Sequence, residues 1–237
     1  MKKRFVKLLS LFLILTIFIG TTVTVSAAPP PSYIYCEDIG YDYVISMSIN
    51  DSYDLTSYYP RGTKSISSCT YNSDVVDVEY YSGRYYIEPY NCGITEVYID
   101  CYDRNDFYLE TISFIVAVFS SQDIRNTTTI YNSYFPQSSY SSRYKADSAY
   151  IDDPYVDCET SKYSDDFVYY NYFIQLYGDI YVDEMGFYDT YVTGYSDVAC
   201  ISVAPDGSYN IALTDVTVKL VWWQWLIKIL LFGWIWY

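Results

Sequence analysis

The stretch TEVYIDCYDRNDFYLETISFIVAV, residues Thr95 to Val118, decides the fold class, because inward and outward side chains alternate at both of its ends. The alternating inward set comprises Thr95, Val97, Ile99 and Cys101, followed by Ile112, Phe114, Val116 and Val118. A period of two is typical of a strand with one buried face. We therefore predict two half-buried antiparallel strands, joined by the acidic turn between them.

Similar patterns extend along the chain in both directions. Turn signals such as Ser82-Gly83 and Asn91-Cys92-Gly93 recur at intervals that suit short strands. Tyrosine supplies 33 of the 237 residues, which favours strands over helices. This spacing of turn signals between short strand-like runs predicts a small β-sandwich over 32–119. The weakly alternating range 120–148 is predicted to be a linker, and strand-like runs predict a second β domain over 149–219.

The N-terminus has the pattern of an export signal. Basic residues precede an apolar run from Leu8 to Ile19, and a small-residue cleavage site ends at Ala27. We predict a signal peptide over 1–27 and a protein that acts outside the cytoplasm, at the extracellular face of the cell membrane or cell surface. The alternative is an uncleaved membrane anchor, for which the apolar run is short. Cleavage would change the formal net charge from −15 to −19, because four basic residues leave with the signal.

The composition excludes several function classes. The chain has no histidine, so Ser-His and Cys-His nucleophile systems cannot be built from it. No phosphate-binding or dinucleotide-binding motif is present, and we expect no cofactor. The acidic balance repels nucleic acid. A pair of carboxylates that cleaves glycosidic bonds remains the enzymatic alternative.

An acidic cluster occupies the turn between the two strands of the opening stretch. It consists of Asp100, Asp103, Asn105 and Asp106. Such oxygens can bind calcium weakly, but Asp and Asn are also ordinary turn residues. We expect turn chemistry and no metal site.

Six cysteines stand in this predicted exported chain, at Cys36, Cys69, Cys92, Cys101, Cys158 and Cys200. Thiols outside the cytoplasm tend to oxidise. Paired C-x-x-C spacing is missing, which argues against zinc. We predict three disulfides, among 15 possible connectivities; some free buried thiols are the alternative.

The segment ISSCTYNSDVVDVEYYSGRYYIEPYNCGITEVYIDCYD, Ile66 to Asp103, resembles the bacterial Ig-like domain of group 2. Val76-Asp77-Val78 matches the Val-x-Val strand of that family, Ser82-Gly83 its glycine turn, and Cys92-Gly93-Ile94-Thr95 its last turn and strand. Cys69 stands where the family has a core tryptophan. The resemblance covers 32–119 and implies an Ig-like sandwich.

The resemblance also implies a covalently fastened core in place of the tryptophan. On it, Cys69 and Cys101 face inward on neighbouring strands and form a disulfide, with Cys36–Cys92 and Cys158–Cys200 as the accompanying pairs. The fold class is then all-β: an Ig-like β-sandwich followed by a second small β-sandwich, with an N-terminal signal helix and a C-terminal hydrophobic helix.

Tyrosine runs offer a binding surface. Tyr80-Tyr81, Tyr85-Tyr86 and Tyr169-Tyr170-Asn171-Tyr172 place one ring on each sheet face in turn. An exposed ring can stack on a sugar or a protein, so a glycan or protein ligand is one interpretation. Structural packing of the same rings is the other.

The C-terminal segment 220–237 is apolar and contains all five tryptophans. The predicted membrane-associating residues are Trp222, Trp223, Trp225, Lys228, Trp234 and Trp236. Eighteen residues make about 27 Å of helix, which barely matches a bilayer of ~30 Å. We predict a helix that lies in the interface of the cell's own membrane, with Gln224 and Lys228 toward water. A full span and a tail folded back on the protein are the alternatives.

These features predict a non-catalytic, exported cell-surface protein that displays Ig-like modules for adhesion or scaffolding. Two alternatives stay open. One is a secreted glycan hydrolase with a carboxylate pair, and the other is a membrane-active tail carried by the β modules.

Overall fold

The computed structural model describes residues 34–131, 138–143, 149–151, 156–160, 167–220 and 222–230. Tyr33–Tyr237 form one compact unit. The predicted signal peptide lies outside the described residues, as do Trp234 and Trp236. These parts of the sequence analysis stay predictions.

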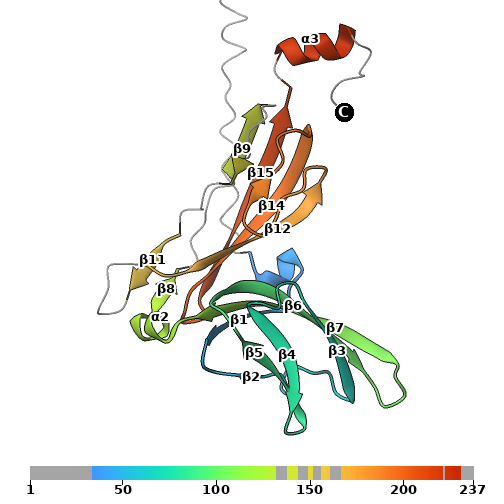
Figure 1. The fold of residues 1–237 in the computed structure, drawn as a ribbon, viewed down its shortest axis with the longest axis vertical. Helices are drawn as coiled ribbons and strands as arrows, with labels where there is room; N and C mark the ends of the chain where they lie inside the picture. Colours follow the sequence, from blue (N-terminus) through green and yellow to red (C-terminus); the bar gives the residue numbers. More distant parts are fainter. Residues whose placement is uncertain are drawn as a thin grey trace, which may run out of the picture. The chain divides into compact units, whose positions relative to one another are not determined.

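The first β region is a sandwich of two sheets (Figure 1). A four-stranded sheet has the order β1-β7-β6-β3 and a three-stranded sheet has the order β2-β5-β4. The bounds of the seven strands are Tyr43–Ser48 (β1), Tyr53–Asp54 (β2), Ser65–Thr70 (β3), Val76–Tyr81 (β4), Arg84–Pro89 (β5), Gly93–Tyr102 (β6) and Tyr108–Phe119 (β7). Strand β1 runs parallel to β7, and all other neighbours are antiparallel. This division of seven strands is the Ig-like arrangement, with the first strand added to the sheet of the last.

The opening stretch forms the β6–β7 hairpin, as predicted. Val97, Ile99 and Cys101 on β6 are fully buried, while the residues between them are half-buried. They pack against the second sheet, which contributes Val76 and Ile87 to the same core. The hydrophobic face of β6 therefore closes the sandwich.

The turn between β6 and β7 is made by Asp103. Its carboxylate Oδ1 accepts hydrogen bonds from the backbone N–H groups of Asn105 and Phe107, at 2.7 and 3.0 Å. These bonds lower the pKa of the Asp103 carboxyl group. Among the described residues, no group of three or more Cys, Asp or Glu side chains is placed to hold a metal ion. Asp103, Asn105 and Asp106 of the acidic cluster lie in the turn, whereas Asp100 lies on β6 and accepts a hydrogen bond from the Thr111 hydroxyl.

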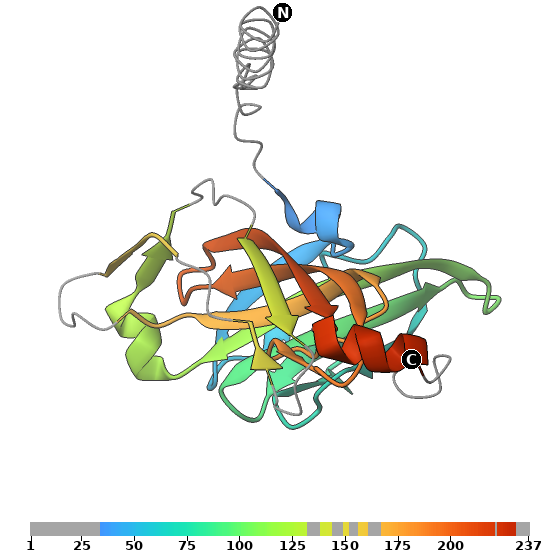
Figure 2. The same ribbon diagram turned by 90° about the horizontal axis from the view of Figure 1, so that it is seen from above.

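A second β region follows the first. Its main sheet has the order β12-β14-β15-β9, and β9 runs parallel to β15. Both views show these strands side by side (Figures 1 and 2). Two smaller sheets pair β10 with β13 and β11 with β8. The bounds are Thr128–Ile130 (β8), Ser138–Arg143 (β9), Ala149–Tyr150 (β10), Cys158–Thr160 (β11), Tyr170–Gly178 (β12), Phe187–Tyr188 (β13), Gly194–Val203 (β14) and Tyr209–Lys219 (β15).

The two faces of the main sheet pack on different partners. Val198 and Cys200 of β14 lie in a core with Tyr188 of β13. Ala199 and Ile201, on the opposite face of β14, lie in a core that belongs partly to the first region. The second region is thus β, as predicted, but one of its faces is closed by the first sandwich.

Strand β7 carries this shared core. Ile115, Ala117 and Phe119 of β7 are fully buried and cluster with Tyr172 of β12 and Ile201 of β14. Every residue of β7 from 112 to 119 is buried. The prediction that this strand is half-buried was therefore wrong, because its outer face is covered by the second region.

The range 120–148 contains more structure than a linker. Helix α2, Ser121–Asn126, begins at Ser120, whose hydroxyl accepts a hydrogen bond from the Asp123 backbone N–H. Strands β8 and β9 also lie in this range. The weak alternation of this range led to the prediction of a linker, but paired strands formed despite it. The module boundaries themselves stay a prediction.

The cysteine pairing implied by the resemblance is not formed. All six cysteines are described, and no disulfide joins any two of them. Cys101 pairs in register with Ile66, whereas Cys69 pairs with Tyr98. Because 66 and 69 are an odd number of residues apart, Cys69 and Cys101 point to opposite faces of the sheet. Cys69 is exposed, so it does not replace the core tryptophan of the resembling family.

Neither of the accompanying pairs is formed. Cys36 and Cys200 are buried, Cys158 is half-buried and Cys92 is exposed. The Cys36 thiol contacts the Asp42 carbonyl oxygen and the Tyr209 hydroxyl, each at 3.7 Å.

Candidate functional site

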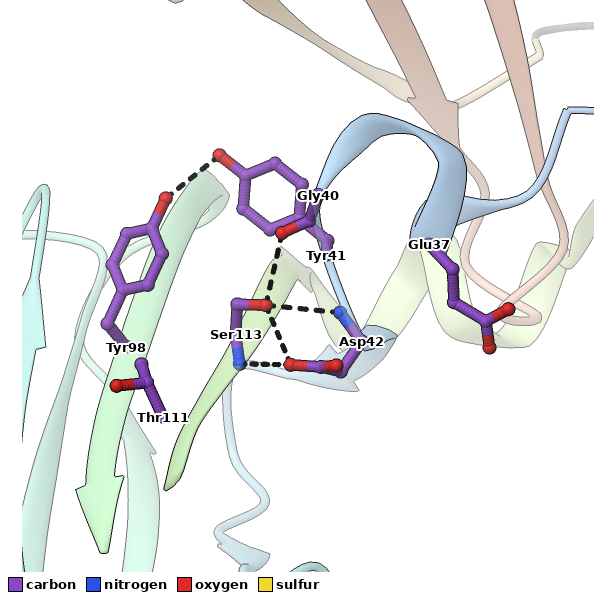
Figure 3. Close-up of a pocket in the computed structure, with 7 residues that line it drawn as sticks. All are labelled: Glu37, Gly40, Tyr41, Asp42, Tyr98, Thr111 and Ser113. Carbon is purple, nitrogen blue, oxygen red and sulfur yellow. Dashed lines mark hydrogen bonds between the residues drawn. The ribbon is translucent and has the colours of Figure 1, made fainter. Parts of the chain in front are cut away.

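Two hollows in the surface share the side chains of Tyr41 and Tyr98. The first, shown in Figure 3, has a volume of about 380 Å³. The second has a volume of about 230 Å³ and is bordered by β12 and the loop after it. We call the second hollow the Glu96 pocket, because Glu96 lines it together with Tyr98, Tyr172, Tyr71, Tyr181 and Glu184.

Tyr41 reaches both hollows because of the turn before it. The short 3₁₀ helix η1, Cys36–Ile39, ends at Gly40, whose φ of 91° is a left-handed conformation that favours glycine. Tyr41 follows and is buried, with 5% of its surface exposed. The tight turn thereby directs a large ring toward β6.

A hydrogen-bonded clamp holds this turn against β7. The Ser113 backbone N–H and hydroxyl both lie 2.8 Å from Oδ2 of Asp42, and the Asp42 backbone N–H lies 3.1 Å from the Ser113 hydroxyl oxygen. Figure 3 shows these contacts, with Glu37 standing apart from them. The clamp fixes the start of β1 and hence the position of Tyr41.

Glu96 is the centre of the second hollow. The Tyr98 hydroxyl donates to its Oε2 at 2.6 Å, and the Tyr172 hydroxyl donates to its Oε1 at 2.8 Å. The Tyr41 and Tyr98 hydroxyls are 3.1 Å apart. Since the Tyr98 hydroxyl uses its hydrogen to bond Glu96, the Tyr41 hydroxyl donates to the Tyr98 oxygen. One carboxylate thus organises three tyrosines from η1's turn, β6 and β12.

These phenols stay protonated over the physiological pH range. Burial, followed by the hydrogen bond with Tyr98, raises the pKa of Tyr41 far above its ordinary value. Burial and the hydrogen bond to Glu96 do the same for the pKa of Tyr172 and raise the pKa of Tyr98 to about 12. The three groups are donors, and none can serve as a base at neutral pH.

Glu184 supplies a second carboxylate at the rim. Its Oε2 accepts a hydrogen bond from the Tyr71 hydroxyl at 3.3 Å. The hydrogen bond with Tyr181 and the nearby Glu184 charge raise the pKa of Tyr71 to about 12. Tyr71 and Tyr181 are 56% and 65% exposed. The pocket therefore has exposed rings at its rim and the buried Tyr172 at its base.

The two hollows offer aromatic rings, hydroxyl groups and carboxylates. The residues that line the two hollows include no lysine or arginine. Ser113 has a carboxylate partner in Asp42, and the sequence contains no histidine from which a Ser-His nucleophile could be built. Both oxygens of Glu96 already accept phenolic hydrogen bonds. The site presents rings and oxygen acceptors.

Sequence reasoning missed most of this site. Glu96 and Tyr98 alternate with the inward Val97, so a period of two already placed them on the outer face of β6. The residues that meet them come from distant parts of the chain, with Tyr172 76 positions away from Glu96. No local pattern predicts that contact.

The predicted tyrosine runs are divided between packing and the surface. Tyr85 packs on the core of the sandwich. Tyr81 and Tyr86 stack on the other face of the three-stranded sheet, with ring centroids 4.2 Å apart and planes at 11°. Tyr172, from the third run, is buried in the Glu96 pocket. The alternation of faces was predicted correctly for Tyr85 and Tyr86.

The tail begins with helix α3, Trp222–Leu230, which follows β15 (Figure 1). Its exposed large side chains are Trp222, Trp223, Trp225, Leu226, Ile229 and Leu230. Gln224 is buried, with 4% of its surface exposed, and Lys228 is half-buried. The prediction that Gln224 faces water was wrong. Within the described part of the chain, no helix has the length and hydropathy needed to cross a bilayer.

No family model and no curated protein matches the chain. Several solved structures align with it at low TM-scores. They include the protocadherin GammaB4 extracellular domain, at 6% identity and a TM-score of 0.21, and chicken VE-cadherin EC1-2, at 15% and 0.25. The D00-D0 domain of intimin aligns at 14% and 0.27.

The alignments cover 65%, 79% and 76% of this chain. They cover 27% of the protocadherin, 100% of the VE-cadherin fragment and 97% of the intimin fragment. At these TM-scores the matches support no functional conclusion. The Ig-like assignment above stands on the strand order of this chain.

Proposed function

We propose that the protein is a non-catalytic, exported β-sandwich protein of the cell surface that acts in adhesion or scaffolding. In this proposal α3 holds it on the outer face of its own cell membrane. The observation that carries the membrane attachment is the reversed polarity of α3, whose polar Gln224 is buried while its apolar stripe is exposed.

The stripe has helical spacing. Trp222, Trp225, Leu226, Ile229 and Leu230 stand at i, i+3, i+4, i+7 and i+8, which places them on one side of the helix. A helix that packs on its own protein buries such a side. Here Ile229 and Leu230 are 68% and 65% exposed. An apolar side turned to solvent fits a helix that lies in the interfacial zone of a bilayer.

Composition and charge favour a helix that lies in the interface. The described part of α3 makes about 13.5 Å of helix, beside a hydrocarbon core of ~30 Å. Tryptophan prefers the headgroup zone. The negative charge of the whole chain disfavours anionic lipid, so neutral headgroups suit this surface best.

The membrane proposal is tested by flotation of the full chain with phosphatidylcholine vesicles. We expect the protein to float with the vesicles and Ile229→Glu to reduce the floating fraction several-fold, because a charge placed in the apolar stripe must be taken out of water. Phe107→Glu is the matched control, since Phe107 is also 68% exposed but lies in the β6–β7 turn. Equal flotation of Ile229→Glu and the parent chain would contradict the proposal.

The binding role is supported by the Glu96 pocket, which offers acceptors and rings. The rival hydrolase needs one carboxyl group that gives and takes protons freely. Glu96 is held by two phenols and does not fit that need. Release of a coloured aglycone from aryl glycosides, lost in Glu184→Gln, would favour the hydrolase over the binding role.

A further inference from the structure

We propose that the Glu96 pocket binds a primary ammonium group, such as the end of a lysine side chain. The inference rests on the adhesive function proposed above and deepens it by naming the chemical class of the ligand.

None of the described residues that line the pocket is a counter-ion for its carboxylates. Glu96 and Glu184 bring two carboxylates, and no lysine or arginine lines the pocket. Within the part of the chain that the structure describes, the recorded ion pair joins Arg84 to Asp54, which do not line it. Carboxylates withdrawn from water are stabilised by cations or several donors. A cationic ligand would supply the positive charge that the described lining residues do not provide.

The hydrogen-bonding capacity of the pocket matches a donor. An ionised carboxylate offers about four acceptor positions. Phenols occupy two of these at Glu96, while Glu184 receives the hydroxyl of Tyr71. The hydroxyl hydrogens of these phenols are therefore already used in hydrogen bonds. The two carboxylates can still accept further hydrogen bonds. An ammonium group has three donors and no acceptor.

The pocket walls also favour a cation. Tyr71 and Tyr181 are exposed at the rim, and a tyrosine face attracts a cation that lies within about 6 Å of the ring. The neighbouring rings of Tyr98 and Tyr172 carry their hydroxyls toward Glu96. A ligand that enters meets the rings of Tyr71 and Tyr181 and the Glu184 carboxylate at the rim before it reaches Glu96.

Size and shape select the ammonium over larger groups. The volume of about 230 Å³ lies below the ~300 to 1,000 Å³ usual for small-molecule sites. A guanidinium binds best to two free oxygens of one carboxylate. At Glu96 both oxygens already accept a phenol. A compact ammonium on a flexible chain needs no such pair.

The test titrates the full chain with Nα-acetyl-lysine amide, with Nα-acetyl-norleucine amide as the uncharged analogue. A non-ionic detergent keeps α3 covered without offering a competing ammonium headgroup. We expect the lysine compound to bind and the norleucine compound to bind at least about five-fold more weakly, which corresponds to about 1 kcal/mol. Added salt should weaken the lysine compound only. Equal affinity for the two compounds would overturn the proposal.

Two variants locate the binding. Glu184→Gln keeps the shape but removes one charge, and we expect it to weaken lysine binding about five-fold or more. Glu79→Gln is the control, because Glu79 likewise accepts a tyrosine hydroxyl, from Tyr90 at 2.5 Å, but lies outside the pocket. Tyr181→Ala, at the exposed rim, should also weaken binding. Unchanged binding in both pocket variants would refute the site.

Two further ligands separate the sources of the ammonium. A short lysine-containing peptide represents a protein partner, and glucosamine represents an amino sugar. Tighter binding of the peptide identifies a protein partner, tighter binding of glucosamine identifies a glycan, and both support the ammonium class. Flotation with vesicles is measured on the same variants. Loss of amine binding with flotation intact would separate a failure of the pocket from a failure of the membrane proposal.

Discussion

At the scale of single residues, Glu96 does the most to order the candidate site. The alternation of β6 was enough to predict that Glu96 and Tyr98 share its outer face. It was not enough to predict Tyr172 as the second donor, because the contact depends on how two sheets meet. A period of two gives the side of a sheet, whereas the partner on that side is set by packing.

Replacing Tyr172 by phenylalanine removes one of the two donors to Glu96. We expect the free energy of unfolding to fall by about 1.5–3 kcal/mol, the usual contribution of a hydrogen bond to a charged group. Tyr195→Phe is the control, because Tyr195 donates to Asp197 from an exposed position. Urea unfolding of both variants measures the difference. Equal stability of Tyr172→Phe and the parent chain would show that Glu96 is satisfied by Tyr98 and water.

The same network predicts a dependence on alkaline pH. The pKa of Tyr98 is about 12 in the folded chain and about 10 in the unfolded chain, so the folded state binds the proton more tightly. This contribution to stability is complete below pH 10 and is lost as the pH rises toward 12. The pKa values of Tyr41 and Tyr172 shift in the same direction.

We expect the free energy of unfolding to fall between pH 10 and about pH 12, and to fall less steeply in Tyr98→Phe. Denaturant unfolding at a series of pH values, with phenolate absorbance recorded in parallel, measures both quantities. A parent chain whose stability stays flat across this range would contradict the assigned network.

At the scale of elements, the strands were more predictable than their surroundings. The two strands predicted from the opening stretch became β6 and β7. The predicted Cys69–Cys101 disulfide did not form because the sequence does not give the register between neighbouring strands. An inward position for Cys69 came from a resemblance, and the register of β3 against β6 moved it to the opposite face.

The orientation of helix α3 is a second feature that the sequence pattern alone does not determine. Its amphipathic spacing could be predicted from the sequence, since Gln224 and Lys228 stand four residues apart. The side of the helix that faces the rest of the protein could not be predicted from the sequence. Hydrophobic burial ordinarily turns the apolar side inward, and the structure turns it outward.

At the scale of the whole molecule, the shared core joins the two β regions. Phe119 is fully buried and its ring stacks on Tyr170, with centroids 4.9 Å apart. Tyr172 and Ile201 belong to the same cluster. The alternation in the sequence predicted two separate regions, because it carries no information about a second sheet that covers the outer face of β7.

We expect both β regions to unfold in one transition, and Phe119→Ala to move that whole transition by about 3–5 kcal/mol. Phe107→Ala, at an exposed turn, should leave it nearly unchanged. Urea unfolding followed by near-ultraviolet circular dichroism of tyrosine measures the transition. Two separate transitions, only one of them sensitive to Phe119→Ala, would show that the regions fold independently.

The double burial of β7 also bears on how this protein can be divided or recombined. A fragment that stops at residue 119 would end in a strand whose outer face is hydrophobic and exposed to solvent. That face carries Ile115, Ala117 and Phe119. Such a surface invites aggregation. Grafting the first sandwich into another protein would therefore require polar replacements on that side, or transfer of the neighbouring sheet along with it.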